Sequence, residues 1–166
     1  MLKQENWYVV YTYPNTERKV YNELGKREIT AFLPTTRVTR QWSDRKKEIE
    51  VPLFPNYVFV RLTPKELWVV AMLNGVVNFI SFNGAPAVVK DTEISLVRKI
   101  VTGCGPVSRE PVIANGERVQ VMHGPLAGLR GKVTDRKGIT RLYVELETIN
   151  QTLAISIDAA LLHKVE

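Results

Sequence analysis

The segment Pro52-Leu-Phe-Pro-Asn-Tyr-Val-Phe-Val60 says most about how the first part of the chain folds. Its last four residues are apolar at every position, whereas a strand with one face in water alternates apolar and polar side chains. The pattern therefore predicts a central strand that is covered on both faces. Pro52 and Pro55 interrupt the extended chain before it, because proline cannot donate a ladder hydrogen bond.

Further strands and helices are expected on both sides of this segment. Runs of aromatic and β-branched residues between turn residues predict strands. Capping residues followed by apolar side chains three or four apart predict helices, such as the helix that Thr63 and Pro64 begin. The expected strands are 7–13, 31–39, 48–51, 57–62, 76–82 and 87–89, and the expected helices are 17–28, 64–73 and 91–101.

The C-terminal part of the chain has a different pattern. Residues 103–116 contain several glycines and prolines and few large apolar side chains, which indicates a connector. Beyond them apolar residues alternate through Val119 and Val121 and again further on, which predicts five or so short strands in a small β-barrel. The chain is therefore expected to be an α+β protein with an N-terminal domain over 1–102, a linker over 103–116 and a second domain over 117–166.

Composition excludes several classes of protein. Of the 166 residues, 45% are hydrophobic and 24% are charged, which is typical of a globular chain. No apolar run reaches the ~20 residues of a membrane helix, and a lone Cys104 indicates a reducing, cytoplasmic setting. One cysteine and two histidines do not suffice for a usual zinc site, and the sequence lacks GxSxG, HExxH and GxGxxG motifs. We therefore expect no enzyme activity, no cofactor and no metal.

Positive charge is concentrated in the first part of the chain. Residues 1–101 carry 15 basic and 10 acidic side chains, a net charge of +5, whereas residues 102–166 carry 8 and 7, a net charge of +1. The densest stretch is 37–47, and a second group lies on the first expected helix. Such a face attracts phosphate groups without sequence preference. A solvated face that only aids solubility is the equally weighted alternative.

The segment 116–133 resembles the KOW motif, a strand–loop–strand unit of ribosomal proteins and transcription elongation factors. Apolar positions of this motif are expected in the barrel core, and its glycines are expected at turns that a Cβ atom would hinder. A glycine-rich hairpin of some other small barrel is the alternative. The positions concerned are Val119, Val121, Gly124, Pro125, Gly128, Gly131 and Val133.

The order of motifs along the chain resembles the NusG family of bacterial transcription elongation factors. The segment 52–60, with Trp7-Tyr-Val-Val-Tyr11 before it and Phe79-Ile-Ser-Phe-Asn-Gly84 after it, is followed by the KOW motif, so the resemblance spans about 6–165. It implies an N-terminal antiparallel sheet flanked by helices and a C-terminal SH3-like barrel. The amino-acid sequence of Pro52–Tyr57 and the 40–47 hairpin favour the specialised antiterminator branch, which includes RfaH and the UpxY regulators. The housekeeping factor is the close alternative.

The resemblance implies that the N-terminal domain docks an apolar hollow onto the clamp helices of RNA polymerase. The matching positions are Tyr11, Phe54, Pro55 and Phe59. Partly exposed aromatic side chains make good anchors, because they bury a large area at a small entropic cost. Phe54, between two prolines, is expected to be the most exposed of the four, and Phe59 to lie partly in the core. That all four are core residues is the alternative.

The resemblance also implies contact with the non-template DNA strand. Lysine and arginine would hold backbone phosphates, and Trp42 would either stack on an unpaired base or pack within the protein. The positions concerned are Thr16, Lys19, Lys26, Arg27, Arg40, Trp42, Arg45, Lys46 and Lys47.

The C-terminal domain is implied to bind other proteins. Its family partners are termination factor Rho and a small-subunit ribosomal protein, although in RfaH the same domain can form a helical hairpin that masks the polymerase site. The resemblance thus predicts a monomeric, non-catalytic elongation and antitermination factor with no membrane partner. A housekeeping NusG-type factor that couples transcription to Rho or the ribosome is one alternative. A ribosome-associated KOW protein that binds RNA is the other.

Overall fold

The computed structural model describes residues 3–103, 107–110, 116–136 and 138–166. The chain is of mixed α and β type, as expected, and the strands of the described residues form four separate groups, two sheets and two hairpins. The elements in chain order are β1 Asn6–Thr12, α1 Glu17–Lys26, β2 Ala31–Phe32, β3 Thr35–Gln41, β4 Lys46–Pro52, β5 Tyr57–Leu62, η1 Pro64–Glu66, α2 Leu67–Ala71, β6 Val76–Phe79, β7 Ser81–Phe82, β8 Ala85–Pro86, α3 Asp91–Gly103, β9 Val107–Arg109, β10 Glu117–Val121, β11 Arg130–Arg136, β12 Ile139–Leu146, β13 Gln151–Ser156, η2 Ala159–Leu161 and β14 Leu162–Lys164.

Four strands form an antiparallel N-terminal sheet in the order β2-β5-β1-β6. Strand β5 lies between β2 and β1, and its pairing with β1 runs from Leu62 opposite Asn6 to Tyr57 opposite Tyr11. Val58, Phe59 and Val60 are each at most 1% exposed. The prediction of a central strand covered on both faces is therefore confirmed.

Helices α1 and α2 cover one face of the N-terminal sheet. Val20 and Leu24, four residues apart on α1, are buried in a cluster with Val10, Val58 and other residues of the sheet. The helix carries Glu17 in its first turn and Lys26 in its last, which suits the helix dipole. It ends two residues earlier than the sequence predicts, because Glu28 adopts a positive φ of 59° that a helix cannot continue.

Thr63 begins the next helical segment as the sequence predicts. Its backbone N–H and its hydroxyl both donate to the Glu66 carboxylate at 2.8 Å, and Pro64 occupies the first helical position. These hydrogen bonds, first the one from the backbone N–H and then the one from the hydroxyl, lower the pKa of Glu66, because both favour the ionised carboxylate.

Six strands form a C-terminal sheet in the order β14-β10-β11-β12-β13-β9, with every pair antiparallel. No pairing joins β14 to β9 among the described residues, so the expected closed SH3-like barrel is not confirmed. Strand β9 lies within the predicted connector 103–116 and pairs with β13, with Val107 opposite Ile155. The predicted connector thus contains a three-residue edge strand, and its role as a linker between two domains stays a prediction.

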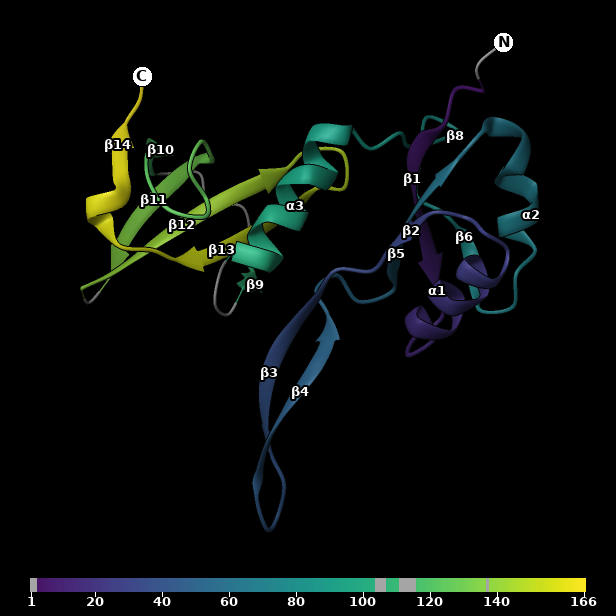
Figure 1. Cartoon of the computed structure of the whole chain (residues 1–166), viewed down its shortest axis with the longest axis horizontal. Coiled ribbons are helices and arrows are strands. Elements are labelled where there is room, and N and C mark those ends of the chain that lie inside the picture. Colours follow the sequence, from purple (N-terminus) through teal and green to yellow (C-terminus); the bar gives the residue numbers. More distant parts are fainter. Residues whose placement is uncertain (1–2, 104–106, 111–115, 137) are drawn as a thin grey trace.

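Strands β3 and β4 form a hairpin of their own. The pairing runs from Thr35 opposite Pro52 to Gln41 opposite Lys46, and Figure 1 shows the ribbon extending away from both sheets. The single strand predicted over 31–39 is divided into β2 and β3, because Leu33 and Pro34 interrupt it. We call this projecting element the β3–β4 hairpin.

Helix α3 joins the two sheets through one continuous hydrophobic core. Its buried residues Ile94, Val97 and Ile100 lie in a cluster with Phe59 of the N-terminal sheet and Leu153 of the C-terminal sheet. Figure 1 places α3 beside the C-terminal sheet, on the side that faces the N-terminal sheet. The division of the chain at residues 102 and 117 therefore stays a prediction, because the core does not separate there.

Candidate functional site

Of the candidate polymerase-binding positions, Tyr11 of β1 and Phe59 of β5 lie on the sheet face that α1 and α2 leave uncovered, and Phe54 and Pro55 lie in the connection between β4 and β5. Side chains alternate along β1 and β5, and Tyr11 is paired with Tyr57 and Val9 with Phe59, so these four residues share that face. The rings of Tyr11 and Tyr57 meet edge to face with centroids 6.1 Å apart. This part of the face is apolar and aromatic.

The four positions differ sharply in exposure. Tyr11 is 37% exposed, and Pro55 is also exposed. Phe54 and Phe59 are each 1% exposed, with ring centroids 5.9 Å apart. The prediction that Phe54 lies at the surface is wrong, because the break between the two prolines turns its ring into the core that α3 and the C-terminal sheet share.

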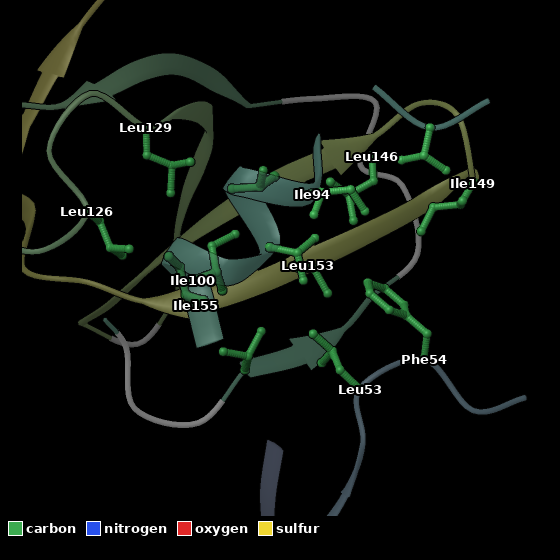
Figure 2. Close-up of a cluster of buried hydrophobic side chains, with 14 of the residues drawn as sticks. Leu53, Phe54, Ile94, Ile100, Leu126, Leu129, Leu146, Ile149, Leu153 and Ile155 are labelled. Atoms are coloured by element: carbon green, nitrogen blue, oxygen red, sulfur yellow. The ribbon is translucent and has the colours of Figure 1, made fainter. Parts of the chain in front are cut away.

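Three parts of the chain meet over these rings. Figure 2 shows Leu53 and Phe54 gathered with Ile94 of α3 and with Leu153 and Ile149 of the C-terminal sheet and its turn. A cavity of only about 10 Å³ remains between Phe59, α3 and the β12–β13 turn, and one water molecule needs about that volume. No open apolar hollow is therefore present at Phe59 in this arrangement.

Polar contacts also hold the arrangement closed. Glu93 at the start of α3 accepts hydrogen bonds from the Thr148 backbone N–H at 3.1 Å and from its hydroxyl at 2.6 Å. The guanidinium of Arg98 lies 4.4 Å from the centroid of the Phe32 ring, within cation–π range. Helix α3 thus contacts the N-terminal sheet with one side and the C-terminal sheet with another.

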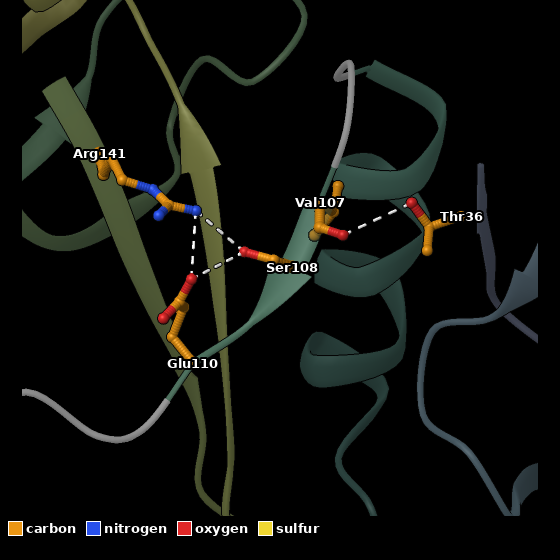
Figure 3. Close-up of polar contacts among 5 residues, drawn as sticks. All are labelled: Thr36, Val107, Ser108, Glu110 and Arg141. Atoms are coloured by element: carbon orange, nitrogen blue, oxygen red, sulfur yellow. Dashed lines mark hydrogen bonds and ion pairs between the residues drawn. The ribbon is translucent and has the colours of Figure 1, made fainter. Parts of the chain in front are cut away.

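The base of the hairpin makes a further contact with the C-terminal sheet. Figure 3 shows the Thr36 hydroxyl directed at the Val107 carbonyl of β9, at 3.5 Å. On the other side of β9, Arg141 donates to the Ser108 hydroxyl at 2.9 Å and pairs with Glu110 at 3.3 Å. These contacts fix β9 against its neighbours, so the closed arrangement is held at several separate points.

The candidate nucleic-acid positions fall into two groups on different elements. Lys19 of α1 and Arg27, directly after the end of this helix, are exposed, and Lys26 pairs with Glu23 at 2.9 Å. The hydrogen bond from Lys26 and its charge lower the pKa of Glu23. The Thr16 hydroxyl donates to the Tyr13 carbonyl at 2.7 Å, which occupies it within the protein.

The second group lies at the tip of the β3–β4 hairpin. All its members are exposed, and Trp42 is 53% exposed. The alternative that Trp42 packs within the protein is therefore disfavoured. The members of this group are Arg40, Trp42, Arg45, Lys46 and Lys47.

The KOW positions lie together in the C-terminal sheet. Val119 and Val121 are 4% and 1% exposed, and Val133 packs against the same core. Pro125 is exposed in the β10–β11 loop, where Gly124 and Gly128 adopt positive φ of 88° and 91°. Both glycines thus sit at turns that disfavour a Cβ atom, as predicted.

Gly131 has a different role from the one predicted. It lies within β11, and a Cβ atom built on it would stand 2.3 Å from the Tyr143 carbonyl oxygen. Gly131→Ala is expected to lower the free energy of unfolding by about 1–3 kcal/mol, because strand β12 has to move. Gly25→Ala is the control, since nothing lies within 4 Å of that site in α1, and it should stabilise by about 0.5–1 kcal/mol. Urea unfolding measures both, and a neutral Gly131→Ala would show that the strands approach less closely.

Comparison with known proteins identifies the family. The family model described as transcription termination factor NusG matches residues 5–98, more than half of the chain. The chain belongs to the NusG family. NusG-family proteins are non-enzymatic transcription factors that interact with RNA polymerase, in agreement with the non-catalytic expectation.

Relatives extend the NusG likeness along the chain. A transcription termination/antitermination protein NusG of Lactococcus lactis is 26% identical, over 98% of this chain and 92% of that protein. The protein of the same name from Thermus thermophilus is 29% identical, over 78% and 81%. A solved structure on domain interaction in Thermotoga maritima NusG has a TM-score of 0.57 at 23% identity, covers 98% of both chains and shares the fold. These names support the NusG family and do not support the specialised RfaH or UpxY branch.

The sequence of this NusG-family chain did not reveal the residues that hold α3 and the C-terminal sheet against the N-terminal sheet. Glu93 has a local signal, since its carboxylate also accepts from the Lys90 backbone N–H at 3.2 Å, three residues earlier. Its bonds to Thr148, 55 residues away, have no local sequence signal.

Among the described residues no helix is long and apolar enough to cross a membrane. The same residues contain no group of three or more side chains that could hold a metal ion.

Proposed function

We propose that this chain is a non-catalytic transcription elongation factor that binds the clamp helices of RNA polymerase. The proposed contact is the face of the N-terminal sheet that carries Tyr11 and Phe59, together with Phe54 and Pro55 of the β4–β5 connection. The observation that supports it most is the NusG family match, which spans the β1 and β5 strands that build this face. The aromatic character of the face provides the anchors that a protein interface uses.

Binding through this face requires the chain to open. Phe54 and Phe59 are each 1% exposed beneath α3 and the C-terminal sheet, so neither can contact a partner in the closed arrangement. An open form would place both rings at the surface. Polymerase would then bind only that form, and the apparent affinity would fall in proportion to the open fraction.

Once bound, the factor is proposed to favour the closed polymerase clamp, suppress pausing and promote read-through of long operons. The basic groups on α1 and on the hairpin would hold the non-template strand. The released C-terminal domain would contact a small-subunit ribosomal protein or Rho. The names of the relatives, which include both termination and antitermination, favour the housekeeping role over the specialised branch.

Transcription in vitro on a template with a strong pause site tests the proposed activity. Saturating protein is expected to shorten the pause lifetime and to raise read-through of an intrinsic terminator, with a heat-denatured sample as the control. A second arm contains Rho, and increased termination there would favour the housekeeping role. Unchanged pause lifetime and unchanged termination in both arms would contradict the proposal. Sedimentation with ribosomes instead of polymerase would favour the RNA-binding alternative.

A further inference from the structure

The connection between β4 and β5 ends in a tight turn. The Tyr57 backbone N–H donates to the Phe54 carbonyl at 3.1 Å, so residues 54–57 form a β-turn. Pro55 is the second residue of this turn, and Asn56, the third, has a positive φ of 70°. These residue types and this backbone conformation are those of a type II turn. The turn contains two of the four proposed polymerase contacts.

Asn56 fixes this turn against the end of β1. Its carbonyl accepts the Thr12 backbone N–H at 2.8 Å, and its side-chain amide donates to the Thr12 carbonyl at 3.0 Å. The preceding residue of β1, Tyr11, has its ring edge to face with that of Tyr57, with centroids 6.1 Å apart. The orientation of Asn56 therefore sets how Pro55 and the Tyr11 ring lie relative to each other.

The backbone N–H of Asn56 is held by a residue of α1. It donates to Oε1 of Glu17 at 2.9 Å. Types I and II differ by a rotation of the central peptide of the turn through about 180°, so this N–H points in opposite directions in the two types. An acceptor at the position of Glu17 therefore favours the type II turn, and with it the positive φ of Asn56.

The burial of Glu17 does not favour folding by itself. The residue is only 7% exposed, and no ion pair includes it among the residues that the structure describes. A buried carboxylate without a cation costs stability, and its place in the first turn of α1 offsets only part of that cost through the helix dipole. An apolar side chain would avoid the cost but would leave the Asn56 N–H without this acceptor.

We propose that Glu17 is a positioning residue for polymerase binding. Its carboxylate holds the 54–57 turn in the conformation that presents Pro55 and Tyr11 to the polymerase. Glu17 is buried, so it acts through Asn56 and not by contact with the partner. This inference rests on the proposed function and deepens it, because it adds a residue of α1 to a contact that the family resemblance assigns to the sheet and the turn.

Substitutions at Glu17 in the full chain test this role. Glu17→Met removes the acceptor and the buried charge while it fills a similar volume, so the fold should be retained. Glu17→Ala removes the same acceptor with a smaller side chain, so the test does not depend on how methionine packs. Glu17→Gln keeps an amide oxygen that can accept the same N–H. Glu23→Met is the matched control, since it removes one carboxylate from the same helix and Glu23 bonds to Lys26.

Amide hydrogen exchange, followed by NMR without polymerase, tests the turn alone. The Asn56 amide is expected to exchange about tenfold to a hundredfold faster in Glu17→Met and Glu17→Ala, because a bond to a charged acceptor is lost. The increase should stay below about tenfold in Glu17→Gln, since a neutral acceptor still forms a weaker bond. Glu23→Met should match the parent chain. The Thr148 amide, whose bond to Glu93 reports the closed arrangement, should be unchanged in every variant.

Affinity for purified core RNA polymerase without nucleic acid tests the consequence for binding. Glu17→Met and Glu17→Ala are expected to bind about tenfold to a hundredfold more weakly than the parent chain, because the competent form of the turn becomes a minor population. Glu17→Gln should recover most of this loss, and Glu23→Met should bind as the parent chain does. Far-ultraviolet circular dichroism checks that all variants are folded under these conditions. A purely structural role would not produce rescue by glutamine among equally folded variants.

Two results would overturn the inference. One is an Asn56 amide that exchanges as slowly in Glu17→Met as in the parent chain. The other is faster exchange with unchanged affinity for polymerase. In both cases, binding of polymerase by the parent chain would leave the proposed function standing. A parent chain without affinity for polymerase would instead contradict the proposed function, and the role of Glu17 in binding with it.

Discussion

Phe54→Ala is expected to lower the free energy of unfolding by about 3–5 kcal/mol. The ring is 1% exposed, packs edge to face on Phe59 with centroids 5.9 Å apart and belongs to the core that α3 shares with both sheets. Removing it leaves a cavity at the point where three parts of the chain meet. Urea unfolding followed by far-ultraviolet circular dichroism measures the loss.

Phe82→Ala is the matched control, because the same side chain is 55% exposed in β7. Its cost should stay within about 0.5 kcal/mol. Equal and small effects at both positions would mean that Phe54 is an exposed anchor, as the sequence alone suggests. Phe54→Asp is not a usable probe of polymerase binding, since it would bury an unpaired carboxylate and unfold the chain.

Local patterns predicted the elements whose structure depends on near neighbours. The unbroken apolar run Tyr57–Val60 identified the central strand. Thr63 followed by Pro64 located the start of a helix. The spacing of apolar side chains predicted a helix over 91–101, which forms most of α3. Each depends on residues a few positions apart, whose spacing is visible in the sequence.

Features that depend on distant parts of the chain were missed. Strand β9 exists because β13 offers it a free edge, and its own three residues carry little signal. Phe54 looks exposed between two prolines until α3 and the C-terminal sheet are placed over it. Gly131 looks like a turn residue until the Tyr143 carbonyl is seen beside it.

The candidate sites divide in the same way. The basic hairpin was predicted from composition, because charge density is a local property. The position of Arg40 opposite Lys47 was not, since it depends on the pairing register of the two strands. The proposed polymerase-binding face follows from family resemblance. The α3 helix and C-terminal sheet that cover this face could not be predicted, because the bond between Glu93 and Thr148 spans 55 residues.

Locking the closed arrangement is expected to have the largest effect on function. Glu93→Cys and Thr148→Cys, in a Cys104→Ser background, place two thiols where the carboxylate now meets the threonine. A short bis-maleimide with a cleavable disulfide would then hold α3 and the β12–β13 turn together. If polymerase binds only the open form, a chain that is about 99% cross-linked should lose about a hundredfold in apparent affinity.

Two controls distinguish the effect of the cross-link from the effects of the substitution and of the reagent. The Glu93→Cys single variant treated with the same reagent carries the modification without the bridge. It should bind polymerase at least as tightly as the parent chain, because it loses the bonds to Thr148 that favour closure. Reductive cleavage of the bridge in the double variant should restore that affinity.

The decisive quantity is the affinity of the double-cysteine chain for purified RNA polymerase, measured before and after the bridge is cleaved. We expect binding to be nearly absent while the bridge is intact and to return on cleavage, because Phe54 and Phe59 become available only when the C-terminal sheet moves away. Equal affinity in the bridged and cleaved states would contradict this, and would mean that polymerase does not bind the covered face of the N-terminal sheet.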